Sequence, residues 1–243
     1  MVLSTEMDAV SDSSRPDGLI RLDGVHKVYQ MGLSQVHALA GVNVTFERNS
    51  FWAVMGPSGS GKSTLLNLLG CLDRPSSGRY TLSGQDVSLL GDDDLSELRL
   101  RQLGFIFQSF NLIPQLTVQE NIELPLYYLG WESARSAQRA RELAELIGLQ
   151  DRLGHRPMEL SGGQQQRVAI ARSLANDPPI LLADEPTGNL DTTTGAQILE
   201  LLVTLYQQNK TIIMVTHEPD IATYATGRLH MRDGRIDSIE GGG

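Results

Sequence analysis

The chain has 243 residues, of which 40% are hydrophobic and 20% charged, a composition typical of a globular protein with one large domain or two small ones. The formal net charge of −9 argues against a nucleic-acid-binding surface, which is usually basic, so no nucleic-acid partner is expected. The single cysteine, Cys71, excludes an internal disulfide and fits a reducing compartment.

Residues 1–17 are polar and partly acidic, and we predict a disordered leader there. They lack the basic segment followed by an apolar one that marks a signal peptide. No stretch of the sequence approaches the roughly 18 apolar residues of a membrane-spanning helix. We therefore expect a chain that neither crosses a membrane nor is secreted through a signal peptide.

Strand-like alternation begins at Leu19–Tyr29 and returns at Val36–Glu47, with Gln30–Gln35 as the expected hairpin connection. These two strands predict a small antiparallel β layer at the start of the fold. Tyr29 ends the first strand, where its ring would either pack at the sheet edge or stack on a purine base. The residue pattern leaves both interpretations open.

The segment from Gly56 to Thr64 fits the phosphate-loop pattern G-x-x-x-x-G-K-[ST], between an apolar strand, Phe51–Met55, and an amphipathic helix, Leu65–Leu69. Glycines let backbone N–H groups turn toward phosphate oxygens, and the helix N-terminus adds its positive end. Lys62 can reach the β- and γ-phosphates, and the Ser63 hydroxyl can ligate Mg²⁺. Because strand and helix flank the loop as the motif requires, the sequence predicts a nucleoside triphosphate site rather than a chance glycine-rich loop.

The middle of the chain continues the alternation of strands and helices. Thr117–Glu120 has the pattern of a capping box, and Asp92–Asp94 place acids where a helix N-terminus favours them. We place Cys71 on the helix after the phosphate loop, as a small core residue rather than a reactive thiol. The predicted elements are a turn at Asp73–Gly78, strands at Arg79–Leu82 and Leu103–Phe107, and helices at Leu95–Arg101, from Thr117, and over Trp131–Gly148.

A second glycine-rich segment, Leu160–Gln164, precedes a helical stretch at Val168–Asn176. Ser-Gly-Gly at a helix N-terminus is a second potential anion site. One chain rarely needs two triphosphate cradles, which suggests that this one serves a neighbouring molecule.

Acidic residues and a histidine follow two further apolar strands. Ile180–Glu185 is an apolar run that ends in two acids, as expected of a buried parallel strand, and Asp184 at its carboxyl end can hold Mg²⁺ beside the phosphate loop. Glu185 can orient or deprotonate a water, which we favour over a role as a helix cap. His217 follows the strand Thr211–Thr216, at the sheet edge where parallel sheets bind ligands. A hairpin closing on Asp233-Gly234 ends the predicted fold.

Taken together, these motifs resemble those of the ATP-binding cassette (ABC) ATPases, the nucleotide-binding subunits of transporters. The phosphate loop and the Asp-Glu pair alone mark only the wider P-loop class. Leu160–Gln164, about twenty residues before Asp184, makes the resemblance specific. The motifs extend from Tyr29 to His217 in the order found in that family.

The resemblance implies a role for each matching residue. Tyr29 would stack on adenine, Lys62 would contact the γ-phosphate, Glu185 would be the catalytic base, and His217 would hold the γ-phosphate and water. Ser63, Gln108 and Asp184 would bind Mg²⁺, with Asp184 acting through a water. Gln108 would also contact the attacking water and report the nucleotide state to a membrane partner. Ser161, Gly162, Gly163, Gln164 and Asp191 would complete the site of a second copy of the chain. The phosphates would lie in the loop formed by Gly56, Pro57, Ser58, Gly59, Ser60, Gly61, Lys62, Ser63 and Thr64.

Within this family, three segments are similar to the lipoprotein-release, macrolide-export and cell-division branch: Cys71–Pro75, Phe107–Pro114 and Asp184–Asp191. This implies a transmembrane permease as partner and a location at the cytoplasmic face of the inner or plasma membrane. Asn49–Trp52 departs from the usual pattern, because Trp52 stands where relatives carry a smaller residue.

The expected fold is α/β: a P-loop core with a mixed, mostly parallel sheet, preceded by an antiparallel β layer and interrupted by a helical insertion. We expect one domain over 18–243, with the β layer and core at 18–108, a helical subdomain at about 109–165, and the core continued at 166–240. The expected function is ATP hydrolysis coupled to movement of a permease. Two alternatives are a regulatory ATPase that relays force to an envelope or cell-division hydrolase, and a soluble cassette ATPase acting on DNA.

Overall fold

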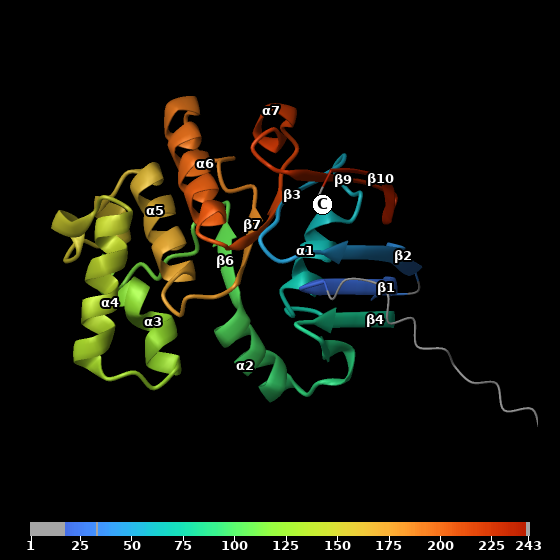
Figure 1. Cartoon of the computed structure of the whole chain (residues 1–243), viewed down its shortest axis with the longest axis horizontal. Coiled ribbons are helices and arrows are strands. Elements are labelled where there is room, and N and C mark those ends of the chain that lie inside the picture. Colours follow the sequence, from blue (N-terminus) through green and yellow to red (C-terminus); the bar gives the residue numbers. More distant parts are fainter. Residues whose placement is uncertain (1–17, 33, 242–243) are drawn as a thin grey trace, which may run out of the picture.

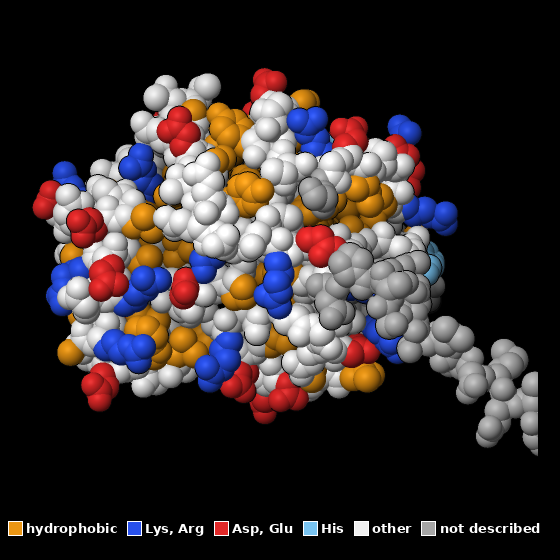
Figure 2. Space-filling model, in the orientation of Figure 1, with side chains coloured by type: hydrophobic (Ala, Val, Ile, Leu, Met, Phe, Trp, Pro, Cys, Tyr) orange, Lys and Arg blue, Asp and Glu red, His pale blue; other side chains and the backbone are white. Residues whose placement is uncertain are grey.

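The computed structural model describes residues 18–32 and 34–241, so the predicted leader at residues 1–17 lies outside the described part. Two β-sheets and the helices around them make up the described fold (Figure 1). Acidic and basic side chains are interspersed on the face seen in Figure 2 rather than gathered into separate areas. Within the described residues, no helix is both long and apolar enough to cross a membrane.

The smaller sheet is antiparallel and has the strand order β2-β1-β4-β5. Its strands are β1 (Ile20–Met31), β2 (Ser34–Phe46), β4 (Ser77–Leu82) and β5 (Gln85–Asp86). The predicted hairpin connection at Gln30–Gln35 was too long, because Gln30 already pairs with Gln35 and Met31 with Ser34. Gly32, at φ +62°, takes the left-handed conformation that permits so tight a turn.

The larger sheet is mixed and mostly parallel, as predicted, with the strand order β10-β9-β3-β8-β7-β6. The parallel strands are β3 (Phe51–Met55), β6 (Leu103–Phe107), β7 (Ile180–Asp184), β8 (Thr211–Val215) and β9 (Gly227–Arg232). The edge strand β10 (Arg235–Gly241) is antiparallel to β9. β3, β7 and β8 therefore lie side by side and end at the same edge of the sheet.

Three of the described α-helices begin at a residue whose side chain caps the first turn. Thr117 forms the predicted capping box with Glu120, and Asp191 caps the helix that follows it, which the sequence analysis did not predict. The helices are α1 (Lys62–Leu69), α2 (Asp92–Gln102), α3 (Val118–Tyr128), α4 (Ser133–Leu146), α5 (Gly162–Ser173), α6 (Thr192–Gln207) and α7 (Pro219–Ala222). Short 3₁₀ turns span Val87–Leu89, Gln150–Arg152 and Pro157–Glu159.

Helix α5 begins earlier than the predicted stretch Val168–Asn176. Its first residue is Gly162, and it ends at Ser173. A capping box explains the early start: the Ser161 hydroxyl accepts from the Gln164 backbone N–H, and the Gln164 side chain accepts from the Ser161 backbone N–H. These two bonds stabilise a first turn that two glycines would otherwise disfavour.

A hydrophobic core lies on each face of the larger sheet. One core contains α1, which lies between the sheets, and side chains of β1, β2 and β4. The other contains α3, α4, α5 and α6. Alternating side chains of β7 serve both cores, because Leu182 faces the first and Leu181 the second.

Trp52 and Cys71 both lie in the first core. Trp52 is 3% exposed and packs edge-on against Phe46, with ring centroids 5.4 Å apart, so the larger residue is accommodated beside the phosphate loop. The predicted position of Cys71 on the helix was wrong, because α1 ends at Leu69 and Cys71 takes a left-handed conformation at φ +53°. Burial raises the pKa of the Cys71 thiol to about 11, which fits the predicted core role.

Candidate nucleotide-binding site

A cavity of about 770 Å³ opens at the carboxyl ends of β3 and β8, and the predicted phosphate loop forms one of its walls. Glu185 and His217 line it as well. The predicted site residues that line the cavity are Gly56, Pro57, Ser58, Gly59, Gly61, Lys62, Ser63, Thr64, Glu185 and His217. Most of the expected phosphate and catalytic residues are therefore brought together.

The phosphate loop adopts a conformation that only glycine tolerates at several positions. Gly56, Gly59 and Gly61 have φ angles of +145°, +79° and +101°. A Cβ at Gly56 would lie 2.2 Å from the Met231 carbonyl oxygen, and one at Gly61 would lie 2.5 Å from the Ala38 carbonyl oxygen. The glycines therefore serve both the turn and close packing against β2 and β9.

The N-terminus of α1 suits an anion. Gly61 is the N-cap of this helix, and no side chain of the described residues caps the backbone N–H groups of the first turn. The first turn also contains no acidic residue. The Ser60 hydroxyl is buried without a hydrogen-bond partner in the described part of the chain. Backbone N–H groups and hydroxyls without a protein acceptor can bind phosphate oxygens.

Lys62 is 9% exposed, and its ammonium lies within the loop. Its Nζ donates to the carbonyl oxygens of Gly56, at 2.8 Å, and Pro57, at 2.9 Å. These bonds satisfy a largely buried charge and keep the ammonium beside the cavity.

The turn of the β9–β10 hairpin holds the phosphate loop from behind. Gly234 donates its backbone N–H to the Ser60 carbonyl oxygen at 3.0 Å, and its own carbonyl accepts from the Ala40 N–H at 2.8 Å. One residue thus links the loop to β2.

Asp184 and Glu185 leave the end of β7 in different environments. Glu185 has an unusual φ of +44°, and its backbone N–H donates to the Val215 carbonyl oxygen on the neighbouring strand. One Glu185 carboxylate oxygen, Oε1, lies 3.0 Å from Nδ1 of His217. This contact joins the ends of β7 and β8 at the cavity.

The pKa of Asp184 is raised above its ordinary value of 3.8, first by burial and then by the neighbouring Glu185 charge, while Lys62 acts in the opposite direction. Asp184 does not itself line the cavity among the described residues. The ionised form of a carboxylate that is partly desolvated and lies beside a second acid is stabilised by a nearby cation.

Gln108 follows β6 and lies beside the loop after Glu185. Its Nε2 lies 3.5 Å from the Asn189 side-chain oxygen, and its backbone carbonyl accepts from Asn189 Nδ2 at 3.0 Å. A Cβ at Gly188 would come within 2.6 Å of Gln108 Nε2. In this arrangement Gln108 contacts the 188–189 loop and is not among the described residues that line the cavity.

Tyr29 lies next to the cavity without lining it, as judged from the described residues. It pairs across the sheet with Val36, which does line the cavity. Its hydroxyl donates to Asp73 Oδ2 at 2.7 Å, and burial, followed by the bond to Asp73, raises the pKa of the phenol. The ring is therefore anchored at its polar end, beside the phosphate loop.

The second glycine-rich segment is not part of this cavity, which none of Ser161–Gln164 or Asp191 lines. It packs instead on the start of α6, where a Cβ at Gly163 would lie 2.2 Å from the Thr194 methyl. Asp191 accepts from both the backbone N–H and the hydroxyl of Thr194, and these bonds lower the pKa of Asp191. One chain thus presents two separate glycine-rich helix N-termini.

The donor set near the phosphate loop fits Mg²⁺. In the described ranges there is no group of three or more His, Cys, Asp or Glu side chains that could hold a metal. Ser63 and Asp184 offer oxygen ligands, and Mg²⁺ typically takes one or two protein oxygens together with water and substrate phosphates. The buried Ser60 hydroxyl and the raised pKa of Asp184 are both consistent with a site completed by charged ligands.

Two histidines at the cavity were missed by the sequence analysis. His37 belongs to β2 and His230 to β9, and both line the cavity beside the phosphate loop. No motif marks them, since each reaches the cavity only through the packing of its strand against the loop.

Comparisons with known proteins agree with this geometry. Residues 39–188 match the family model described as ABC transporter. The chain is 53% identical to an ABC transporter ATP-binding protein of Thermotoga maritima, over 91% of this chain and 95% of that protein. It is 50% identical to the macrolide export ATP-binding/permease protein MacB of Brucella melitensis, over 90% of this chain but only 34% of that protein.

A solved structure is similar over nearly the whole fold. The dimeric post-hydrolysis state of the ATP-binding cassette MJ0796, bound to ADP and Pi, superimposes with a TM-score of 0.86 at 43% identity. The match covers 92% of this chain and 99% of that one. The predicted fold class and family are thus confirmed, and the chain belongs to the ATP-binding cassette transporter family, as an ATPase.

Proposed function

We propose that the chain is the ATP-hydrolysing subunit of a transporter of the macrolide-export and lipoprotein-release type, acting on a membrane permease. The MacB relative supports this, because its name joins an ATP-binding part to a permease and the chain aligns with about a third of its length. In this proposal the protein lies at the cytoplasmic face of the inner or plasma membrane and is held there by the permease.

The catalytic proposal rests on the contact between Glu185 Oε1 and His217 Nδ1, which lie 3.0 Å apart in the cavity that the phosphate loop also lines. Glu185 is the general base that accepts a proton from the attacking water. His217 holds the γ-phosphate and orients that water. Lys62 gives up its hydrogen bonds to the carbonyl oxygens of the phosphate loop and donates instead to oxygens of the β- and γ-phosphates. Tyr29 stacks on adenine.

Ser63, Gln108 and Asp184 would hold Mg²⁺, which when bound neutralises charge on the phosphates. Gln108 contributes to this site once it leaves its contact with Asn189. The same movement would pass the nucleotide state to the permease, through a helical subdomain at about residues 109–165.

A second copy of the chain completes the site. Ser161–Gln164 and Asp191 lie outside the cavity of their own chain, at a helix N-terminus suited to an anion. Two cradles and one triphosphate per chain suit a two-fold dimer with two shared sites. The dimeric form of the MJ0796 cassette supports this arrangement.

Co-purification tests the proposed partner. The tagged chain, expressed in its native host, should capture an integral membrane permease, and the complex should release phosphate from ATP only when Mg²⁺ is present. A four-span permease with a large extracytoplasmic domain is the expected partner. Capture of an envelope hydrolase with the permease would favour the regulatory alternative, and capture of DNA without any membrane protein would contradict the proposal.

A further inference from the structure

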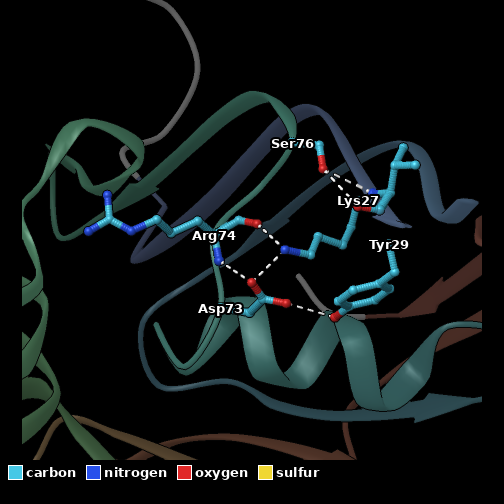
Figure 3. A network of polar contacts seen from close by, with 6 residues as sticks. Lys27, Tyr29, Asp73, Arg74 and Ser76 are labelled. Atoms are coloured by element: carbon cyan, nitrogen blue, oxygen red, sulfur yellow. Dashed lines mark hydrogen bonds and ion pairs between the residues drawn. The ribbon is translucent and has the colours of Figure 1, made fainter. Parts of the chain in front are cut away.

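Asp73 lies at the centre of a polar network that connects β1 to the loop after α1 (Figure 3). Its Oδ2 accepts from the Tyr29 hydroxyl at 2.7 Å, and its Oδ1 accepts from Lys27 Nζ at 2.5 Å and from the Arg74 backbone N–H at 2.7 Å. Both carboxylate oxygens therefore have partners, and the Tyr29 hydroxyl acts as a donor in a charge-assisted bond.

Lys27 strengthens the orientation of the tyrosine. Its ammonium lies over the Tyr29 ring, 4.8 Å from the centroid, and also donates to the Arg74 carbonyl oxygen at 2.9 Å. A cation over one face of an aromatic ring attracts it and so helps to hold the ring in place. With 12% of its side chain exposed, Lys27 is held tightly in this position.

The loop that carries Asp73 is joined firmly to α1. The Cys71 and Leu72 backbone N–H groups donate to the carbonyl oxygens of Leu68 and Asn67, each at 2.9 Å. Ser76 binds the loop to β1, because its backbone N–H donates to the His26 carbonyl and its hydroxyl accepts from the Val28 N–H. The loop that follows α1 is thus tied both to the helix and to β1, and it holds the Asp73 carboxylate at the Tyr29 hydroxyl.

We propose that Asp73 is a positioning residue for nucleotide binding, which holds the Tyr29 ring at a fixed distance from the phosphate loop so that base and triphosphate are bound together. The proposal rests on the proposed function, in which Tyr29 stacks on adenine. Asp73 orients the Tyr29 ring before the nucleotide binds, so that binding does not include the entropy cost of ordering the ring.

The test compares two ligands by isothermal titration calorimetry of the full chain. Mg-ATP occupies both the base and the phosphate subsites, whereas inorganic tripolyphosphate occupies only the phosphate loop. Asp73→Ala should weaken ATP binding by roughly 5- to 20-fold, because the charge-assisted hydrogen bond that orients the Tyr29 ring is lost, and change tripolyphosphate binding by less than about twofold. Equal weakening of both ligands would indicate that Asp73 merely supports the phosphate loop, and would overturn the proposal.

Tyr29→Phe provides a second route to the same bond, because it keeps the ring and removes only the hydroxyl. It should weaken ATP binding to the same extent as Asp73→Ala, and the double variant should be no weaker than either single one. If Asp73→Ala does not fold, Tyr29→Phe decides the question alone, and wild-type ATP affinity in that variant would refute the assignment.

Asp92→Ala is the matched control. Asp92 is exposed and pairs with the Arg74 guanidinium at 2.6 Å, next to the network but not in contact with Tyr29. This variant should bind both ligands as the wild type does. Tyr29→Ala tests base stacking separately from the role of Asp73. Normal ATP binding by this variant would contradict base stacking itself. Weak ATP binding by Tyr29→Ala, with normal binding by Asp73→Ala and Tyr29→Phe, would contradict only the role of Asp73.

Discussion

Among individual residues, Glu185 stands out for its strained backbone and its partner. A non-glycine residue at φ +44° is uncommon, and here it directs the carboxylate to His217 at 3.0 Å. Strain of this kind persists only where the surrounding structure imposes it. Glu185 is held on both sides, because its N–H donates to the Val215 carbonyl and its own carbonyl accepts from the Gly188 N–H, each at 3.0 Å.

We predict that Glu185→Gln retains ATP binding, because the amide is nearly isosteric and the phosphate loop is untouched. Turnover should fall by at least about 100-fold, the lower range for loss of a general base. Steady-state phosphate release and nucleotide titration on the same preparation measure the two effects. More than half of the wild-type rate in this variant would remove Glu185 from the role of base.

Asp184 allows a prediction about pH. Because burial and the Glu185 charge raise its pKa above the ordinary 3.8, the ionised carboxylate destabilises the nucleotide-free fold at neutral pH. Asp184→Asn should therefore raise the thermal midpoint of the nucleotide-free protein at pH 7. As the pH falls from the raised pKa toward 3.8, Asp184 becomes protonated first in the folded state and the advantage of Asn should shrink; below 3.8 it is protonated in both states and the advantage should disappear.

Thermal melts from pH 3 to pH 8, with and without Mg-ATP, measure this effect. The same variant should lose the stabilisation that Mg²⁺ adds to bound ATP, because the carboxylate ligand is gone. An Asn variant less stable than the wild type at pH 7 without nucleotide would contradict the pKa argument.

Among the elements, the β9–β10 hairpin has a role beyond closing the sheet. Its turn residue Gly234, at φ +73°, contacts both the phosphate loop and β2, and a Cβ there would lie 2.8 Å from the Ala38 carbonyl oxygen. The turn between β4 and β5 provides a comparison. Gly84, at φ +82°, follows Ser83 at φ +49°, as Gly234 follows Asp233 at φ +49°, but a Cβ on Gly84 would meet no atom of residues 18–32 or 34–241 within 4 Å.

We predict that Gly84→Ala costs about 1–2 kcal/mol of unfolding free energy, from the left-handed backbone alone, with unchanged KM for ATP. Gly234→Ala should cost roughly 1–3 kcal/mol more, because a backbone carbonyl cannot move aside easily, and should raise the KM for ATP. Urea unfolding and steady-state kinetics of the two variants provide the comparison. Equal KM values in both would show that the hairpin does not position the phosphate loop.

For the whole molecule, the proposed dimer makes the sharpest prediction. Glu185→Gln should be monomeric without nucleotide and dimeric with ATP in analytical ultracentrifugation, because ATP would bridge the two copies. Adding Gly162→Asp should abolish the dimer while leaving ATP binding by the monomer intact. The new carboxylate would stand where the γ-phosphate of the partner must lie.

Gly162 is the right position for this test. In the described part of the chain, a Cβ there would meet Leu190 and Phe110, each at 3.6 Å, an ordinary contact, whereas at Gly163 it would collide with the Thr194 methyl at 2.2 Å. Gly162→Asp therefore changes charge without forcing α6 to move, and an acid in the first turn of a helix is favourable. If the double variant dimerises with ATP as well as the single one does, Ser161–Gln164 is not a shared phosphate site.

The sequence by itself determined the features whose physical causes are local. The strands at Phe51–Met55 and Leu103–Phe107 were predicted with the observed bounds, and the strand predicted from the run Ile180–Glu185 ends one residue earlier, at Asp184. A short apolar run between turn signals specifies a buried strand. The phosphate loop and the Thr117 capping box were identifiable for the same reason, since their chemistry lies within a few consecutive residues.

Only the tertiary structure decided which distant segments meet. Gly234 reaches Ser60, His230 reaches the cavity, and Asp73 reaches Tyr29 because β9 pairs with β3 and α1 lies between the two sheets. Periodicity describes which side of an element is apolar, but it does not specify the order of strands in a sheet. That order depends on the packing of both cores at once, so the residues that support the phosphate loop from behind could not be predicted from their own neighbours in the sequence.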